Sequence, residues 1–524
     1  MIMTVIGLSL VALLTTVAVT AVNGDSHVST RDFTRKQAYE AAKAGIDEYA
    51  YHLHKDTGYW AKCTNVGTPT AVNQKGSTTN RRPVPGTTNA SYAIELIPAT
   101  GQSTCDGSSI AAATASMLEP IGSMKGTFRI RSTGFVGSSE VSITATFKPA
   151  SFLDYVYFTQ LETSDPVTYG NENTIKGAYE QCSKTLAGGR YTATIPNSGG
   201  KYCDAISFVH GDNIKGPMHT NDAFAICEDP TLGRNANDPV EVSAPSPGWY
   251  STTNIPHSGS NCTGNPNFAG TFTTNSPALL PPTTNSSLAT LAEPAFKFKG
   301  QVRICLTGAT MTVRTGSAKT CEGGTVAYSG AQPANGIVYV ENIACSGAYS
   351  PFETKYEETA AAKECGNVYV QGTYSKPLTI AAGNDIVIDG NITKTSEEAV
   401  LGLIANNFIR VYHQTELFTW VDSFGRTRSE CRNTEEKFEN PVIEAAILAI
   451  NHSFIVDSYN CGAKLGTLTV KGAIAQKYRG AVGTSGGTGY LKNYEYDERL
   501  HTIAPPSFIE PVQSDWVIGR ETVG

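Results

Sequence analysis

Residues 1–22 of the chain are uncharged and predominantly apolar. They read MIMTVIGLSLVALLTTVAVTAV, and the first charged side chain is that of Asp25. About 20 residues at a rise of 1.5 Å span the roughly 30 Å hydrocarbon core of a bilayer. Backbone groups in lipid have to bond within the segment, so a segment placed there is helical. The pattern predicts an apolar helix over residues 1–22.

The pattern changes to a period of 3.6 residues over residues 34–53, which predicts an amphipathic helix. Charged residues lie largely on one side of it, and glycine at position 24 is a weak point between the two halves. We therefore expect a long N-terminal helix over residues 1–54, apolar over 1–22 and amphipathic over 25–54. The other side carries small and apolar residues that we expect to pack on a sheet: Ala38, Ala41, Ala42, Gly45, Ile46, Tyr49 and Leu53.

A secretory signal peptide cut near residues 21–24 is the alternative interpretation of the N-terminus. The apolar run is long for the core of such a peptide, and it has no Lys or Arg in front of it. The amphipathic continuation favours a helix that is retained.

Residues 55–150 show strand patterns. Apolar and polar residues alternate over residues 126–147 on either side of a Gly-Ser-Ser turn, which predicts a β-hairpin. A further strand is expected at residues 92–97. The first 150 residues are therefore expected to be an α+β module, with the long helix lying on an antiparallel sheet.

The helix segment QAYEAAKAGID and the strand pair around RIRSTG resemble those of type IV pilins, especially the larger pilin-like assembly proteins, over residues 1–148. In that family a prepilin peptidase removes a basic leader, the new N-terminus is methylated, and the apolar half-helices bundle in the filament core. The resemblance implies Met1 as the processed and methylated residue. The sequence departs from the family pattern at position five, where family members usually have Glu and this chain has Val5. The residues implied for the filament core are Met1, Val5, Ile6, Leu8, Leu10, Leu13, Leu14 and Val17.

Short apolar runs separated by Gly, Asn and Asp recur over residues 151–504. Strands of that length and spacing indicate a sandwich or a solenoid, and the pattern of residues 378–393 favours a β-solenoid-like stack. Residues 442–483 resemble the distal domain of large pilus-assembly proteins. We expect a large all-β distal region over 151–504 and a C-terminal strap over 505–524.

Twelve cysteines and a low share of charged residues, 17%, are typical of an exported protein. An even number without any C-x-x-C spacing favours structural disulfides over metal or redox sites. Pairing between neighbours along the chain is the simplest expectation. The candidates are Cys63, Cys105, Cys182, Cys203, Cys227, Cys262, Cys305, Cys321, Cys345, Cys365, Cys431 and Cys461.

Candidate chemistry is sparse. His210, Asp212, His219 and Asp222 are weak candidates for a metal site, with a turn stabilised by Asp and Asn as the simpler interpretation. The G-x-S-x-G of residues 483–487 lies in a glycine-rich stretch rather than between a strand and a helix, as a nucleophile elbow requires. No cofactor fingerprint is present. A net charge of −7 gives no support to nucleic-acid binding.

These features together predict a non-enzymatic, extracellular protein that is inserted in the membrane before assembly and then becomes a subunit of a surface filament. Its expected partners are further copies or other pilins, a prepilin peptidase and the inner-membrane assembly machinery. A singly anchored adhesin and a secreted β-helix enzyme acting on polysaccharide are the alternatives.

Overall fold

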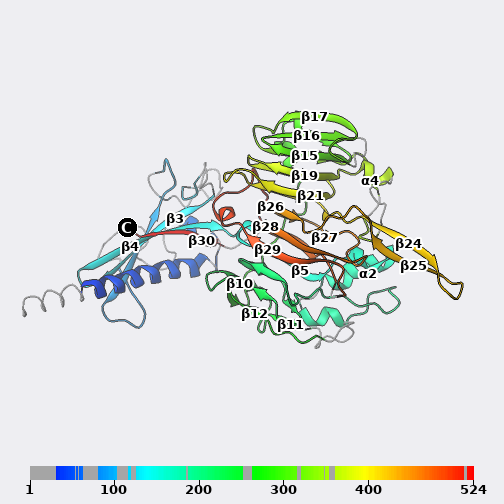
Figure 1. Cartoon of the computed structure of the whole chain (residues 1–524). Helices are drawn as coiled ribbons and strands as arrows, with labels where there is room; N and C mark the ends of the chain where they lie inside the picture. The colour runs from blue at the N-terminus through cyan, green and yellow to red at the C-terminus, as the bar shows by residue number, and fades with distance from the viewer. Residues whose placement is uncertain are drawn as a thin grey trace, which may run out of the picture. The chain divides into compact units, whose positions relative to one another are not determined.

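The computed structural model of the protein describes residues 31–53, 55–56, 58–62, 81–102, 105, 116–119, 126–184, 187–251, 262–315, 320–346, 349–352, 360–484, 486–512 and 516–523. The chain divides into two compact units (Figure 1). The first comprises Met1–Ala150 with Asp515–Gly524, and the second comprises Ser151–Ser514.

The first unit is an antiparallel sheet with one helix over residues 31–53 and a short 3-10 helix, η1 (Tyr59–Lys62). The strand order is β1-β2-β3-β4-β30, so the C-terminal strand completes the sheet beside β4. The strands are β1 (Arg82–Pro83), β2 (Ala90–Ile97), β3 (Phe128–Val136), β4 (Ser139–Pro149) and β30 (Trp516–Val523).

The core of the first unit lies between the helix and the sheet. Alternate residues of β3 and β4 face it, because successive side chains of a strand point to opposite faces. Phe128 and Phe147 stack with ring centroids 5.1 Å apart, and Tyr49 of the helix contacts both rings. Trp516 of β30 packs on Phe128 at 4.9 Å.

Parallel strands dominate the second unit. Its central ladder joins, in spatial order, β14 (Lys297–Lys299), β18 (Ile337–Glu341), β20 (Leu378–Ala382), β22 (Leu401–Ala405), β26 (Val442–Ala449), β28 (Lys464–Arg479), β5 (Tyr157–Ser164), β7 (Met218–Thr220), β10 (Pro239–Val242) and β13 (Thr271–Thr273). Matched positions along most of this ladder carry buried apolar side chains: Val338, Ile380, Leu403, Ile447, Ile474, Tyr157, Met218 and Val240. This row fixes the register, because a slip by one residue would turn every one of these side chains to the opposite face.

Two further ladders flank the central one. One joins β15 (Val302–Gly308), β19 (Val368–Tyr374), β21 (Ile386–Lys394), β23 (Ile409–Val411) and β27 (Phe454–Val456), with the antiparallel strands β16 (Thr310–Thr315) and β17 (Thr325–Ala331) beyond β15. The other joins β28, β29 (Gly489–Tyr496), β6 (Asn213–Lys215), β9 (Thr231–Leu232) and β12 (Asn267–Phe268).

The remaining elements of the second unit are short. A parallel pair is formed by β8 (Phe224–Ile226) and β11 (Trp249–Ser251), and a hairpin by β24 (Thr415–Val421) and β25 (Thr427–Asn433). The helices are α2 (Glu172–Cys182), α3 (Ser287–Leu291) and α4 (Ala360–Glu364), with 3-10 turns η3 (Phe152–Asp154), η4 (Pro166–Tyr169), η5 (Ala187–Thr192), η7 (Pro294–Phe296) and η9 (Glu498–His501).

The predicted fold class is wrong. The structure is mostly β, with 43% strand and 15% helix, and its described residues form neither the long N-terminal helix nor a closed solenoid. The described part of the N-terminal helix covers residues 31–53 only, and residues 1–30 lie outside the described residues.

The central ladder is not one stack in chain order. Each of its two runs, β5 to β13 and β14 to β28, follows the chain, but the last strand of the second run is joined to the first strand of the first. Strands β5, β7, β10 and β13 run outward, the chain then restarts at the far end with β14, and β28 returns to pair with β5. Figure 1 shows β28 and β5 side by side in the middle of this unit. Residues more than 300 positions apart thus form its central seam, as in the hydrogen bond between Arg479 and Glu162.

No helix in the described part of the chain is both long enough and apolar enough to span a bilayer. The residues expected in the filament core, from Met1 to Val17, lie outside the described residues, and so does the expected processing site. The expected C-terminal strap is divided: residues 505–512 belong to the second unit, while β30 is a strand of the first.

Candidate contact surface

The hairpin of β24 and β25, which we call the arm, is the most exposed apolar feature of the second unit. Its two strands pair only with each other among the described strands, and Figure 1 shows them extending away from the ladders. Five large apolar side chains of the arm are exposed: Leu417 (70%), Phe418 (40%), Trp420 (37%), Val421 (66%) and Phe424 (79%).

Local sequence explains the hairpin. β-branched and aromatic residues favour strand in β24, and the tip closes around Asp422. Its carboxylate accepts hydrogen bonds from the backbone amides of Phe424 (2.9 Å) and Arg426 (3.0 Å). Gly425 adopts a φ of +73°, a conformation that glycine takes without steric cost. The backbone amide of Arg426, helped by the side chain of Arg428, lowers the pKa of Asp422.

The arm has two chemically different faces, because the pairing register places alternate residues together. One face, the charged face, carries Glu416, Phe418, Trp420, Arg428, Glu430 and Arg432. The other, the uncharged face, carries Leu417, Thr419, Val421, Thr427, Ser429 and Cys431.

The arginines of the charged face are paired within the arm. Arg432 forms an ion pair with Glu430 and places its guanidinium 3.6 Å from the centroid of the Phe418 ring. Arg428 donates to Asp422 at 2.9 Å. The Phe418 and Trp420 rings stack with centroids 5.8 Å apart. These arginines are therefore already bound to carboxylates and rings within the arm.

The base of the arm is fixed to the unit by covalent and polar bonds. Cys431 forms a disulfide with Cys461. Oδ1 of Asn433 accepts from Nε2 of His413 at 3.0 Å, and Nδ2 of Asn433 donates to the Ala463 carbonyl at 3.1 Å. Gly462 permits this approach, since a Cβ there would lie 1.7 Å from Oδ1 of Asn433. The arm is presented from a rigid base.

The four weak metal candidates are not brought together. His210 is 74% exposed, whereas the side chains of the other three are buried. Each has its own partner: Asp229 for His210, Lys492 for Asp212, Glu241 for His219 and Arg190 for Asp222. Among the described residues one group has the spacing of metal ligands, Cys227, Glu228 and Cys262, but its two cysteines form a disulfide.

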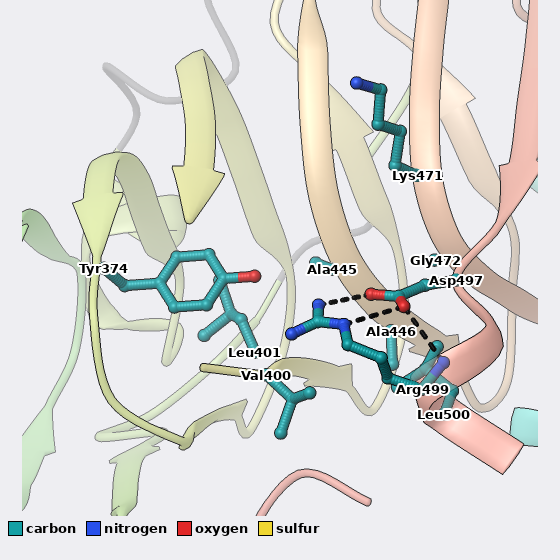
Figure 2. Close-up of a pocket in the computed structure, with 10 residues that line it drawn as sticks. All are labelled: Tyr374, Val400, Leu401, Ala445, Ala446, Lys471, Gly472, Asp497, Arg499 and Leu500. Atoms are coloured by element: carbon teal, nitrogen blue, oxygen red, sulfur yellow. Dashed lines mark hydrogen bonds and ion pairs between the residues drawn. The ribbon is translucent and has the colours of Figure 1, made fainter. Parts of the chain in front are cut away.

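The second unit has a recess beside β22, β26 and η9 (Figure 2). Its volume is about 180 Å³ with the solvent at its mouth included, below the roughly 300 Å³ of typical small-molecule sites. Figure 2 shows the guanidinium of Arg499 turned to the carboxylate of Asp497, to which Nε donates at 2.9 Å. Nη1 of Arg499 donates to the Ala399 carbonyl at 3.0 Å. The charged groups of this recess are engaged with the protein itself.

Buried ion pairs are concentrated inside the second unit. Arg410 donates to both carboxylate oxygens of Asp457, at 2.9 and 3.0 Å, and its Nη1 lies 3.8 Å from Asp385. Burial raises the pKa of Asp385 to about 6, although Arg410 and the Phe408 amide oppose the shift. A second buried carboxylate beside one guanidinium therefore leaves an uncompensated charge above that pH.

We expect Asp385→Asn to change stability in a pH-dependent way. A carboxyl whose pKa is raised on folding binds more protons in the folded state, so its contribution to stability is lost as pH rises from about 4 to 6. Asparagine keeps an acceptor for the Phe408 amide and removes the charge. The variant should match wild type near pH 4.5 and be more stable by about 1–3 kcal/mol at pH 7.5.

Urea denaturation at both pH values measures this difference. Asp457→Asn is the matched control, because it weakens the bidentate partner of Arg410 and should destabilise the unit at pH 7.5. A stability difference for Asp385→Asn that is the same at both pH values would contradict the assignment.

The structure places the remaining predicted residues as follows. The helix residues expected to face a sheet, from Ala38 to Leu53, are all buried. Five disulfides are described, and each joins neighbours along the chain: Cys182–Cys203, Cys227–Cys262, Cys305–Cys321, Cys345–Cys365 and Cys431–Cys461. Cys105 is also disulfide-bonded, while Cys63 lies outside the described residues. Disulfides of this number are typical of an extracellular protein.

The arm was missed at the sequence level, although it carries a recognisable signal. Residues 415–421 (TELFTWV) are rich in β-branched and aromatic types, Asp-Ser-Phe-Gly follows as a turn, and residues 426–433 continue as a second strand. Its exposure has no such signal, because the same pattern also describes a buried hairpin.

Comparisons with known proteins add little. No family model matches the chain, and no curated protein matches it. Among solved structures, the crystal structure of the competence-associated pilin ComZ from Thermus thermophilus matches with a TM-score of 0.28 and 11% sequence identity, over 94% of this chain and 97% of that one. The two structures are too dissimilar for this match to bear on function.

Proposed function

We propose that the protein is a structural subunit of an extracellular filament of the type IV pilus kind, with the second unit displayed for contact with surfaces. Residues 1–22 would supply the apolar packing between subunits, and the first unit would connect them to the second. Its role would be structural rather than enzymatic. Its partners would be other copies or other pilins, a prepilin peptidase and the assembly machinery of the inner membrane.

The observation that carries the proposal is how the helix over residues 31–53 is seated. Its Ala and Gly side packs directly on an antiparallel sheet, with Ala38, Ala42 and Ile46 fully buried. Its other side remains exposed and charged, as at Lys36, Glu40 and Lys43. The uncharged run of residues 1–22 precedes this helix in the chain. A segment of that composition needs lipid or other apolar segments around it.

Deleting residues 1–24 tests the proposal in the producing cells. We expect the wild-type chain to be found in filaments sheared from the surface and imaged by electron microscopy with an antibody to the second unit. The deleted chain should fold, with its disulfides formed, but be missing from filaments.

A matched pair of point variants controls for length. Val17→Asp should prevent incorporation, because a carboxylate in an apolar contact costs several kcal/mol, whereas Val17→Leu should not. Filaments that still contain the deleted chain would contradict the proposal. A wild-type chain that stays in the membrane and never enters filaments would instead indicate a singly anchored adhesin.

A further inference from the structure

Apart from Cys431, which is bonded to Cys461 at the base, the uncharged face of the arm is an apolar surface without a partner among the described residues. Leu417 and Val421 lie on it at 70% and 66% exposure. Thr419 and Ser429 lie between them and Thr427 lies beside Val421, so the rest of the accessible face carries hydroxyl groups. A two-stranded ribbon is marginally stable in water and normally gains a third strand or a packing surface. The arm is therefore held at its base, and its uncharged face is available to bind another molecule.

The charges of the arm and of the chain indicate what kind of molecule can bind the uncharged face. The arm holds three acidic residues and three arginines, so its formal charge is zero (−3 + 3), while the whole chain has a net charge of −7. Two copies therefore repel each other overall, but not at the arm. Contact through the uncharged face also removes no charge from water, which is the main cost of burying polar surfaces.

The same features disfavour other partners. A polyanion would need free cationic groups, but Arg428 and Arg432 lie on the opposite face and are paired with carboxylates of the arm. Arg426, at the tip, is paired with Asp422 as well. Insertion into lipid would leave the open backbone edges of both strands, and the hydroxyl groups of Thr419 and Ser429, without hydrogen-bond partners. Another ribbon with the same face can accept those hydroxyl groups across the contact.

We propose that the uncharged face of the arm binds the uncharged face of the arm of a second copy, ribbon against ribbon, about a two-fold axis. Such a contact is isologous, so the same residues, Leu417 and Val421, are buried on both sides. Each face is about 24 Å long and 10 Å wide, from seven residues at about 3.4 Å and two strands about 4.8 Å apart. The contact is thus smaller than a stable dimer interface and is weak for a single pair.

Weak contacts become effective when many are displayed together. This part of the inference rests on the proposed function, because an ordered filament would present the arms of many copies at once. The pairing of two arms itself does not need a filament.

Sedimentation equilibrium of the full chain in a mild detergent tests the pairing, at concentrations up to the high micromolar range. The double variant Leu417→Glu, Val421→Glu places two carboxylates on the uncharged face, and we expect its association constant to fall by at least ~100-fold. Phe424→Glu is the matched control, because Phe424 is even more exposed, at 79%, but lies at the tip. The association constant of this variant should equal that of wild type. Mass spectrometry of the Cys431–Cys461 bond and circular dichroism establish that the variants remain folded.

Three outcomes would overturn the pairing. Association that is unchanged in the double variant, or lost equally in Phe424→Glu, would do so. So would flotation of the wild-type chain with phosphatidylcholine vesicles that Phe424→Glu abolishes, since this would make the arm a membrane contact. Filaments seen by electron microscopy without arm-dependent association would refute only the arm pairing. Arm-dependent association without filaments would refute only the filament.

Discussion

Replacing Gly134 by valine is expected to separate the helix over residues 31–53 from its sheet. Gly134 lies on β3, on the face that also carries Phe128 and Ile130. A Cβ at this position would lie 2.0 Å from the carbonyl oxygen of Ala38 and 2.3 Å from the amide nitrogen of Ala42. These are backbone atoms of a helix, which cannot give way as a side chain can.

The expected cost is about 3 kcal/mol or more, at the upper end of overpacking changes, because the helix has to move as a whole. Gly45 on the helix makes the complementary approach, since a Cβ there would lie 2.3 Å from the Ser132 hydroxyl and 2.7 Å from the Tyr92 ring. Helix and sheet therefore meet through small residues, and neither side has room to compensate for the other.

Urea denaturation followed by tryptophan fluorescence measures the loss in stability, because Trp60 lies in the core of this unit and Trp516 packs against that core. Hydrogen exchange measured in a peptide from residues 31–53 shows whether the loss of stability occurs at the helix. Thr144→Val is the matched control: Thr144 is on β4 of the same sheet but lies on the opposite face from Ile143, so its stability should stay within about 0.5 kcal/mol of wild type. Unchanged protection of the helix in Gly134→Val would refute this account of its seating. If the proposed function is correct, the variant should also be depleted from surface filaments.

The seating of the helix shows what local sequence can and cannot supply. The period of 3.6 residues places Ala38, Ala42 and Ile46 on one side, and the structure buries these residues. The residue of the sheet that these helix residues contact cannot be deduced from a periodic pattern. Gly134 lies in a strand pattern like any other, and its closeness to Ala38 depends on how a helix and a strand far apart in the chain come together.

The order in which the strands of the second unit pair could not be predicted from the local sequence for the same reason. Short apolar runs predict strands, and most of the runs in residues 378–475 are strands in the structure. Nothing in those runs specifies that β28 pairs with β5, a strand far away in the chain, in addition to β26 and β29. That choice depends on the register of Ile474 with Tyr157, which only the assembled ladder reveals.

The burial of charged side chains also could not be predicted from residue type. Arginine is among the residues least often buried, yet Arg190, Arg410 and Arg479 are among the largest fully buried side chains of the described residues. Each is buried because a carboxylate far away in the chain meets it. The arm is the opposite case, since Leu417 and Val421 have types typical of a core and lie in water.

Replacing Arg479 by methionine is expected to destabilise the second unit by about 3–5 kcal/mol, because it leaves the carboxylate of Glu162 buried without its cation. Nη1 of Arg479 donates to Oε2 of Glu162 at 2.8 Å, and the two side chains are 1% and 0% exposed. The guanidinium also lies 3.6 Å from the centroid of the Phe208 ring. Methionine retains that apolar contact, so the loss of stability measures the contribution of the charge of Arg479.

A double-mutant cycle separates the pair from its surroundings. Adding Glu162→Gln to Arg479→Met removes the unpaired charge, and the double variant should recover at least half of the lost stability. Glutamine still accepts from the hydroxyl of Tyr157, which donates to Glu162 at 3.0 Å. Lys471→Met is the exposed control: Lys471 is 46% exposed and 3.8 Å from Glu444, so its removal should cost less than about 1 kcal/mol.

Urea dependence of hydrogen exchange in peptides from β5 and β28 is the measurement, since it reports on the seam itself. We expect Arg479→Met to lower the opening free energy of both strands together, because Arg479 lies on β28 and Glu162 on β5. A loss confined to β28 would mean that the pair does not hold the two strands together. Equal losses in the single and double variants would mean that packing, rather than charge, is what Arg479 contributes. Because β5 begins the part of the ladder that runs outward and β28 ends the part that returns, loss of this one ion pair should weaken the join between the two parts of the unit while each part keeps its own strand pairs.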